Sequence, residues 1–405
     1  MKIVLLCKSD SLGGAAIVTY RLMDALCREG HDARMLVVDR RTDDPRVDLA
    51  GTPEHYRWAF YSERIRIFAA NGLNRRDLFK VSTASDGVDV LAHPWVKAAD
   101  VVCLNWINQG LLSLRDLRRL AASGKKLVWT MHDMWCFTGI CHHAYDCRGY
   151  VGSCGRCPFV RLRRRGDLSH RIWLQKRDIY AEAQIHFVAV SSWLADRARE
   201  SLLLHRADVT VIPNALPVEQ FAWQRTGDTS KTIVAMGAAR LDDPVKGFEL
   251  MIDAANYIAD NAPDAASRIQ LLLFGNLRNP EVLNTLRLPH RWIGPVAPDR
   301  IQSIYQGADV VLSSSHFETS GATLAEGLAA GCMPVAFDHG GQSDIIDHLQ
   351  TGYLAKHPDA ADLADGILWA ASRRADRESL HKIAADRFGD RQVARRYIDF
   401  FNSLK

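Results

Sequence analysis

Short runs of β-branched and other apolar residues alternate with helical patterns from one end of the chain to the other. Five runs in the first half have the length and composition of buried strands: Ile3–Cys7, Ala33–Val38, Val101–Leu104, Lys126–Met131 and Phe187–Val190. A helical pattern covers residues 16–29, after the first of these runs. Strands that alternate with helices predict βαβ units around a parallel sheet.

The alternation pauses between Leu202 and Asp228 and then starts again. The pause contains Pro213, Pro217 and a polar stretch at residues 224–231, which together predict a domain boundary near residue 214. Beyond the boundary the same pattern returns, with strands and helices expected at Thr232–Met236, Phe248–Asp260, Ile269–Phe274, Val310–Ser313, Thr323–Ala330 and Met333–Phe337.

The chain is therefore expected to form two doubly wound, Rossmann-like α/β domains that face one cleft, residues 1–214 and residues 215–385. Residues 386–405 are expected to cross back to the first domain as a helix, with Tyr397, Phe400 and Phe401 on its docking side. In open parallel sheets ligands bind beyond the carboxyl ends of the strands, so the residues that follow each strand are the first candidates for a site.

The composition is that of an ordinary globular protein. Of the 405 residues, 47% are apolar and 24% charged, which excludes disordered, collagen-like and coiled-coil chains. No apolar run approaches the ~20 residues of a membrane span, and the N-terminal run ends at Lys8, too early for a signal peptide. We therefore expect a cytoplasmic protein. The 51 basic and 47 acidic residues are too evenly balanced to require a nucleic-acid partner.

Two strand ends in the first half carry candidate ligand contacts. Gly13 and Gly14 precede a predicted helix, where a backbone without side chains lets a ligand approach the positive helix N-terminus; a tight turn would explain the pair equally well. His132 follows a predicted strand and is expected to direct its imidazole into the cleft, with a core histidine as the alternative.

Two cations follow the first strand of the second half. Arg240 comes after Gly237, and Lys246 precedes Gly247 at the start of the next helix. We expect both cations to be unpaired and directed at one strand end, where Arg holds phosphate oxygens bidentately and Lys acts as a point charge. This pattern predicts a diphosphate site, and solvated surface charges are the alternative.

Two glutamates, Glu318 and Glu326, flank the start of a small-residue helix after the strand Val310–Ser313. Glu318 is expected in the loop, near a sugar, and Glu326 two turns into the helix, where it would accept hydrogen bonds from ribose hydroxyls. The amides of residues 319–322 would face phosphates. A solvated helix face is the alternative, although carboxylates embedded among small apolar residues are rarely buried without a partner.

These residues together resemble the retaining glycosyltransferases of the GT-B fold, family GT4: Arg240 with Lys246-Gly247, Glu318-x7-Glu326, and Gly340-Gly341. The resemblance extends over nearly the whole chain. The segments 105–110, 132–139 and 154–158 are similar to those of colanic-acid-type and capsular exopolysaccharide transferases.

The resemblance implies transfer of a hexosyl group, with retention, from a nucleotide diphosphate sugar to a glycan or a polyprenyl-diphosphate-linked acceptor. Arg240 and Lys246 would neutralise the diphosphate, Glu326 would hold the ribose, and Glu318 and His132 would lie at the donor sugar. The departing phosphate would accept the acceptor's proton. No Asp-x-Asp occurs in the sequence, so catalysis without a metal cofactor is expected.

The expected site residues fall into three groups. The catalytic residues are His132, Glu318, Arg240 and Lys246. The donor site would hold Gly13, Gly14, Gly237, Arg240, Lys246, Gly275, Thr319, Ser320, Gly321, Ala322 and Glu326. The acceptor would contact Asn105, Trp106 and Asn108 in the first domain.

Five of the nine cysteines lie within residues 136–157. Four thiolates, from Cys141, Cys147, Cys154 and Cys157, can form a tetrahedral structural zinc site. Cys136, His142 or His143 could replace one of these four ligands. An iron–sulfur cluster and free thiols are the alternatives.

A basic run follows the cysteines, at residues 161–165, with Arg171, Lys176 and Arg177 beyond it. Such a run is commonly a solvated helix surface, but it can also attract a polyprenyl pyrophosphate or the headgroups of the inner-membrane surface. A rival interpretation is that the protein is not an enzyme but a zinc-containing nucleic-acid-binding protein that binds through the cysteines and this basic run. That interpretation leaves two-thirds of the chain unexplained and lacks the extended basic footprint of such a binder.

Overall fold

The computed structural model describes residues 1–75, 77–222 and 231–404. The chain divides into two compact units: unit 1 comprises Met1–Ala215 and Val393–Lys405, and unit 2 comprises Leu216–Gln392. Of the polar stretch expected at the boundary, residues 224–230 lie outside the described residues.

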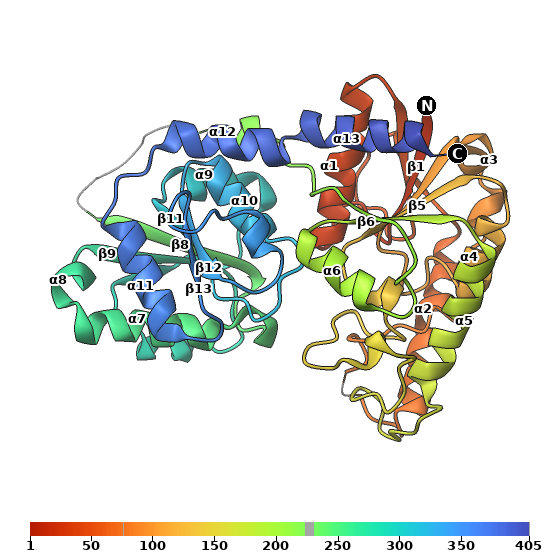
Figure 1. Cartoon of the computed structure of the whole chain (residues 1–405), viewed down its shortest axis with the longest axis horizontal. Helices are drawn as coiled ribbons and strands as arrows, with labels where there is room; N and C mark the ends of the chain where they lie inside the picture. The colour runs from red at the N-terminus through yellow and green to blue at the C-terminus, as the bar shows by residue number, and fades with distance from the viewer. Residues whose placement is uncertain (76, 223–230, 405) are drawn as a thin grey trace. The chain divides into compact units, whose positions relative to one another are not determined.

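Unit 1 is built on a seven-stranded parallel sheet with the order β3-β2-β1-β4-β5-β6-β7 (Figure 1). Its strands are β1 (Lys2–Leu6), β2 (Asp32–Val37), β3 (Val47–Leu49), β4 (Val101–Leu104), β5 (Lys126–Met131), β6 (Ile185–Ala189) and β7 (Val209–Val211). Its helices are α1 (Gly14–Arg28), α2 (Pro53–Ala70), α3 (Pro94–Ala98), α4 (Leu114–Ala121), α5 (Leu168–Glu182) and α6 (Ser192–Glu200), together with most of α13 (Asp390–Ser403).

Alternate residues of the unit 1 strands enter two different cores, because successive side chains of a strand point to opposite faces of the sheet. Leu6 and Leu36 belong to the core on one face, and Leu5 and Val37 to the core on the other. A sheet buried on both faces explains the continuous apolar runs from which these strands were predicted.

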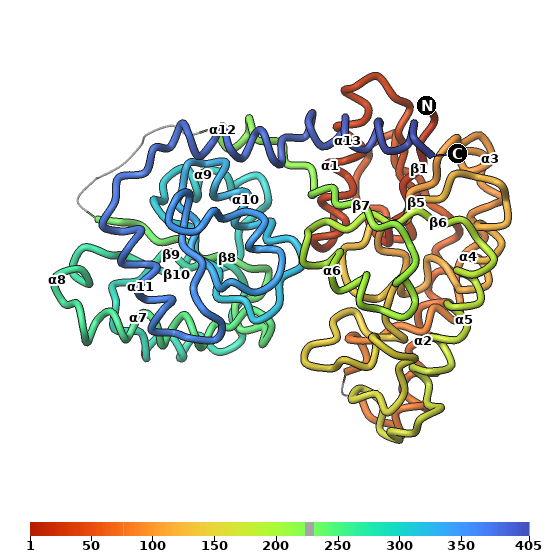
Figure 2. The backbone as a smooth tube through the Cα atoms, viewed as in Figure 1, coloured from red at the N-terminus to blue at the C-terminus, as the bar shows by residue number. Residues whose placement is uncertain are grey.

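Helix α13 completes the second of these cores. Figure 2 shows this helix, in blue, running along unit 1 beside α1. Tyr397 and Phe401 are buried in the same cluster as Leu5, and the Tyr397 hydroxyl lies 3.1 Å from Thr130 Oγ1 on β5. Lys126 donates to the carbonyl of Leu404 at 2.7 Å.

Unit 2 repeats the architecture with a six-stranded parallel sheet of order β10-β9-β8-β11-β12-β13. Its strands are β8 (Thr232–Arg240), β9 (Ile269–Asn276), β10 (His290–Trp292), β11 (Val310–Ser313), β12 (Met333–Phe337) and β13 (Tyr353–Ala355). Its helices are α7 (Phe248–Asn261), α8 (Pro263–Ala266), α9 (Pro298–Gln306), α10 (Ala322–Ala329), α11 (Ala360–Ala371) and α12 (Arg377–Phe388).

The prediction of two doubly wound, parallel α/β domains is therefore confirmed. In each sheet the strand order reverses direction beside one strand, between β1 and β4 in unit 1 and between β8 and β11 in unit 2. The carboxyl ends at such a switch point frame the usual ligand crevice of this architecture. Within the described ranges no helix is long and apolar enough to span a bilayer.

Candidate functional site

The switch point of unit 2 carries a lysine–glutamate ion pair. Lys246 ends the short 3₁₀ helix η5 (Pro244–Lys246) after β8, and Glu318 lies in the loop after β11. Lys246 Nζ donates to Glu318 Oε2 at 2.9 Å. The structure therefore brings together two of the residues that the sequence assigned to catalysis.

Two glycines allow the loops around this pair to approach each other closely. Gly247 has φ +57, and a Cβ there would lie 2.1 Å from the carbonyl oxygen of Ser314. Gly340 has φ +95, and its Cβ would lie 2.2 Å from the carbonyl oxygen of Glu318. Both the positive φ and the lack of space require glycine. The Gly340-Gly341 pair thus supports the Glu318 loop, to which Gly341 N–H also donates at 2.9 Å.

The charge state of the pair follows from its surroundings. Burial raises the pKa of Glu318, but the Lys246 ammonium and the amides of Gly321 and Ser320 outweigh burial, so the pKa lies below its usual value. The Glu318 charge in turn raises the pKa of Lys246 above its usual value. At neutral pH the site therefore holds an ammonium and a carboxylate in contact.

The amides expected to face phosphates have a different partner in this structure. The N–H groups of Ser320 and Gly321 point to Glu318 Oε1, at 3.5 Å and 3.3 Å. Gly321, with φ +66, is the N-cap of α10, and Thr319 and Ala322 flank these two residues in the loop and the first turn. A carboxylate thus occupies the start of this helix, as the helix dipole favours.

The expectation of two unpaired cations is wrong for both residues. Lys246 pairs with Glu318, and Arg240 forms ion pairs with Asp242 at 3.3 Å and Asp243 at 3.1 Å. The reason is local sequence: Asp242 and Asp243 follow Arg240 in the turn after β8 and reach its guanidinium. An incoming anion would have to share these cations with carboxylates.

Glu326 is buried in the middle of α10, about one turn beyond the start of that helix and not two as the sequence predicted. Its charge contributes to raising the pKa of the buried Tyr305 phenol, after the larger effect of burial. The sequence placed Glu318 in a loop and Glu326 inside the helix, and the structure has both in those positions.

Gly237 and Gly275 have a packing reason for lacking side chains. A Cβ at Gly237 would lie 2.0 Å from the Phe274 ring, and one at Gly275, with φ +121, would lie 1.8 Å from the carbonyl oxygen of Ala238. The two glycines thus keep β8 and β9 in close contact near their carboxyl ends.

A group of imidazoles beside the Glu318 loop was not foreseen from the sequence. His316 Nδ1 lies 3.0 Å from His357 Nε2, and His316 Nε2 lies 2.7 Å from Glu249 Oε1. His339 stacks on His357 with ring centroids 4.6 Å apart. The signal that could have revealed His316 is its position two residues before Glu318; His357 comes from beyond β13, and sequence spacing does not connect it to the site.

At the switch point of unit 1, a pocket of about 300 Å³ opens at the Gly13-Gly14 turn. It is lined by Cys7, Lys8, Ser9, Leu12, Gly13, Gly14, Ala15, Ala16 and Trp106. Gly13 adopts φ +94, and a Cβ at Gly13 or Gly14 would meet no atom within 4 Å, so both residues leave open space above the turn. Lys8, which sequence analysis did not assign to the site, donates to Gln109 Oε1 at 2.7 Å and lies over the Trp106 ring.

His132 and Asn105, which directly follow the neighbouring strands β5 and β4, contact each other. His132 Nε2 lies 2.9 Å from Asn105 Oδ1. Burial lowers the pKa of His132 to about 4, against a smaller opposing effect of Asp133. The imidazole is therefore neutral at physiological pH, so its contact with Asn105 is a hydrogen bond between uncharged groups.

Asp133, next to His132, connects two aromatic side chains near the carboxyl end of β5. Its Oδ2 accepts from Trp106 Nε1 at 2.8 Å and lies 2.7 Å from His142 Nδ1. The rings of Trp106 and His142 lie 5.3 Å apart. Asn108 is buried, and its Nδ2 donates to no group in the described part of the chain. The three residues expected to contact an acceptor thus lie together in the segment after β4.

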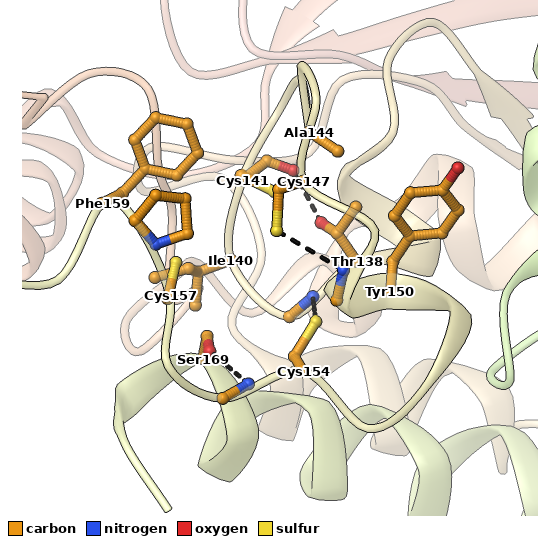
Figure 3. Close-up of a pocket in the computed structure, with 14 residues that line it drawn as sticks. Thr138, Ile140, Cys141, Ala144, Cys147, Tyr150, Cys154, Cys157, Phe159 and Ser169 are labelled. Carbon is orange, nitrogen blue, oxygen red and sulfur yellow. Dashed lines mark hydrogen bonds between the residues drawn. The ribbon is translucent and has the colours of Figure 1, made fainter. Parts of the chain in front are cut away.

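The four cysteines expected to bind zinc line one small cavity of about 20 Å³ in unit 1 (Figure 3). Two of their sulfurs accept backbone hydrogen bonds, Cys154 Sγ from Gly139 N–H at 3.3 Å and Cys147 Sγ from Gly149 N–H at 3.4 Å. As arranged within residues 1–75, 77–222 and 231–404, no three His, Cys, Asp or Glu side chains could hold a metal ion. The zinc site therefore stays a prediction.

One residue of the expected basic surface lies inside the protein. Lys176 is fully buried, its Nζ donates to the carbonyls of Trp135 at 2.5 Å and Thr138 at 3.1 Å, and burial lowers its pKa to about 7. Lys176 belongs to the interior beside the cysteine cavity, because α5 turns this position inward.

Two protein-family models match the chain in succession. The model described as Glycosyltransferase Family 4 matches residues 12–220, more than half of the chain. The model described as Glycosyl transferases group 1 matches residues 218–387. The two matches meet close to the division between unit 1 and unit 2.

Curated relatives share part of the sequence. Mannosylfructose-phosphate synthase of Agrobacterium fabrum is 29% identical over 168 residues, covering 38% of this chain and 36% of that protein. D-inositol 3-phosphate glycosyltransferase of Nocardia farcinica is 27% identical over 192 residues, covering 43% of this chain and 42% of that protein. The chain thus spans about two fifths of the length of these relatives.

Solved structures share the fold over the full length. HepE of Anabaena, crystallised in complex with UDP, has a TM-score of 0.62 and 15% identity, with 100% of both chains covered. Sucrose-phosphate synthase of Thermosynechococcus elongatus has a TM-score of 0.66 and 17% identity, with 99% of this chain and 98% of that chain covered.

Proposed function

The chain belongs to Glycosyltransferase Family 4, and from that premise we propose that it transfers a hexosyl group from a nucleoside diphosphate sugar to a glycan or a polyprenyl-diphosphate-linked acceptor, with retention of anomeric configuration. The single observation that best supports this function is the ion pair of Lys246 with Glu318 at the switch point of unit 2. Arg240, at the end of β8, supplies a second cation.

The proposed reaction breaks the bond between the anomeric carbon and the diphosphate oxygen. The acceptor oxygen forms its bond to the anomeric carbon on the same face, and its proton passes to the departing phosphate. Negative charge grows on that phosphate as the bond breaks, and in this proposal Lys246 and Arg240 stabilise the transition state by their positive charge. We propose that no metal ion is needed, because these cations supply that stabilisation.

Glu318 has two roles in this proposal. Before the donor arrives, its carboxylate holds the Lys246 ammonium in position across 2.9 Å. Once the diphosphate engages Lys246, Glu318 lies beside a sugar ring that gains positive charge as the bond to phosphate breaks. A carboxylate that is ionised at neutral pH stabilises that charge.

The remaining site residues are proposed to bind and orient the substrates. Glu326 accepts hydrogen bonds from ribose hydroxyls, and the neutral imidazole of His132 contacts the donor sugar. The acceptor lies at Asn105, Trp106 and Asn108 in unit 1. The buried Nδ2 of Asn108 supports a polar ligand there, because a buried donor without an acceptor is costly.

UDP sugars are the first donors to examine, since HepE was crystallised with UDP and with UDP-glucose. The motifs that resemble those of colanic-acid-type and capsular enzymes support a role in exopolysaccharide or capsule assembly. We propose that the protein performs it in the cytoplasm.

The proposal can be tested without a known acceptor by incubating the protein with a panel of nucleotide sugars. Donor hydrolysis is then measured as the amount of nucleotide released. We expect release from one donor class and thermal stabilisation by the matching nucleoside diphosphate. A Lys246→Met variant should lose both responses, whereas Arg373→Ser, a change at an exposed position of unit 2, should keep them. Stabilisation by a short oligonucleotide and by no nucleotide would contradict the proposal.

A further inference from the structure

Helix α2 exposes three large apolar side chains and buries two charged ones. Trp58, Tyr61 and Ile65 lie three and four positions apart, so they share one face of the helix, and they are 58%, 60% and 64% exposed. A surface helix ordinarily directs its apolar stripe inward and its charges outward.

The buried face of α2 holds two charged residues beside the apolar Ala59 and Ile67. Glu63 and Arg64 are buried and form an ion pair at 2.6 Å. Glu63 Oε1 also accepts hydrogen bonds from the Ser82 hydroxyl at 2.6 Å and from the Ala84 amide at 2.8 Å. These bonds fix the rotation of α2 about its axis, so the apolar face is held outward.

Two further exposed leucines lie at the end of this helix. Leu73, just beyond α2, is 70% exposed, and Leu162 is 60% exposed. The two segments are joined by Arg161, whose amide donates to Asn71 Oδ1 at 2.9 Å and whose guanidinium donates to the carbonyl of Gly72 at 3.1 Å. We call Trp58, Tyr61, Ile65, Leu73 and Leu162 the α2 patch.

Cations flank the α2 patch. Residues 161–165 are all exposed, and four of the five are arginines. Within the described residues, Arg163, Arg164 and Arg165 have no carboxylate at ion-pair distance. Figure 1 shows α2 on the flank of unit 1, extending away from the sheet towards the loops drawn in yellow and yellow-green.

We propose that the α2 patch and the arginines of residues 161–165 dock unit 1 onto a bilayer surface that contains anionic lipids. Trp and Tyr side chains prefer the headgroup level of a membrane, and Ile and Leu beside them enter the acyl boundary. Guanidinium groups bind lipid phosphates at the same depth. The combination favours lipid over nucleic acid, since exposed Ile and Leu contribute nothing to phosphate-backbone binding.

This inference goes beyond the proposed function and does not depend on it. Vesicle sedimentation needs no nucleotide sugar, so a failure of membrane binding is distinguishable from a failure of catalysis. The full-length protein is mixed with vesicles of phosphatidylcholine alone and with vesicles that also contain phosphatidylglycerol, at low and at high salt.

We expect binding to the anionic vesicles only, weakened by salt that screens the arginines. The variant Arg163→Ser/Arg164→Ser/Arg165→Ser should bind on the order of 100-fold more weakly, and Trp58→Ser/Ile65→Ser on the order of 10-fold more weakly. The matched controls in unit 2 are Arg373→Ser/Arg374→Ser and Leu349→Ser, all at exposed positions, and they should bind as the wild type does.

Quenching by brominated lipids tests whether the helix face itself enters the bilayer. The wild type should lose tryptophan fluorescence on binding, and Trp58→Phe should lose markedly less. Since Trp58 and Ile65 are exposed, unchanged thermal melting of the variants in the absence of vesicles verifies that they fold.

Three results would overturn the proposal: absence of binding to anionic vesicles at low salt, equal binding by the arginine variant and the wild type, or equal quenching in Trp58→Phe. Concentration-dependent dimers that disappear in Trp58→Ser/Ile65→Ser, without vesicle binding, would assign the face to a second copy of the chain instead.

Discussion

Lys246 and Glu318 are 72 positions apart in the sequence and meet at 2.9 Å because they follow adjacent strands of one parallel sheet. Each holds the other in its charged form, since the pKa of the lysine is raised and that of the glutamate lowered. The charge that would meet a diphosphate is therefore already oriented before any donor binds.

Replacing Arg240 by Ala should weaken binding of a nucleoside diphosphate by roughly 10- to 100-fold, because a charge-assisted hydrogen bond contributes ~1.5–3 kcal/mol. Binding of the uncharged nucleoside should change little. Isothermal titration with both ligands makes the comparison, and equal losses for the two would rule out a diphosphate contact.

The two glutamates should respond differently to substitution. Glu326→Gln should raise the donor KM with a smaller effect on kcat, since it removes binding common to ground and transition states. Glu318→Gln should mainly lower kcat, because its carboxylate acts on charge that develops in the transition state. Steady-state kinetics with one identified donor decide the matter, and swapped patterns would reverse the two assignments.

The half-buried His132 should make stability fall in mild acid. Its pKa is lowered from 6.5 to about 4. As the pH drops below the higher value the unfolded chain takes up a proton that the folded chain does not, and folding loses free energy until the lower value is reached. Urea unfolding at about pH 7 and about pH 5 should give a smaller difference for His132→Gln than for the wild type. The exposed His205→Gln is the control, and an equal drop in all three proteins would contradict the prediction.

Activity should persist in excess EDTA, provided that any structural metal remains bound, because Lys246 and Arg240 are proposed to stabilise the leaving diphosphate. The measurement is donor turnover before and after dialysis against the chelator. An absolute and rapidly reversible requirement for Mg²⁺ or Mn²⁺ would refute it.

The four cysteines that line the small cavity lead to a prediction about the zinc content of the purified protein. Elemental analysis of protein purified without added metal should find one zinc per chain, lost in Cys157→Ser together with thermal stability. Cys332→Ser, at a buried cysteine of unit 2, is the control and should keep the zinc. A stable Cys157→Ser protein and no stoichiometric metal in the wild type would identify the four residues as free thiols.

Sequence patterns predicted the strands well where both faces of a sheet are buried, since runs such as Val101–Leu104 are then apolar throughout. They missed α2, because the burial of Glu63 and Arg64 and the exposure of Trp58 and Ile65 disturb the periodicity on which helix prediction depends. Hydrogen bonds from Ser82 and Ala84 offset the cost of burying that charge, and sequence spacing does not reveal such bonds.

For the candidate site, the sequence predicted which residues take part better than it predicted which of them contact each other. The cysteines of the small cavity and the segment of Asn105 and Trp106 were identified from spacing and resemblance. The partner of Lys246 was not, because contact between two loops depends on strand order, which only the folded sheet defines. The amides of Ser320 and Gly321 were likewise expected at a phosphate, whereas the Glu318 side chain folds back onto them.

The placement of α13 bears on the order in which the protein is completed during synthesis. Tyr397 and Phe401 fill a core whose members outside this C-terminal segment all come from the first 215 residues of the chain. The ribosome therefore makes all of unit 2 before it supplies the last piece of unit 1. Until those residues emerge, the part of this core that α13 covers stays exposed to water beside α1, and a chaperone would bind there.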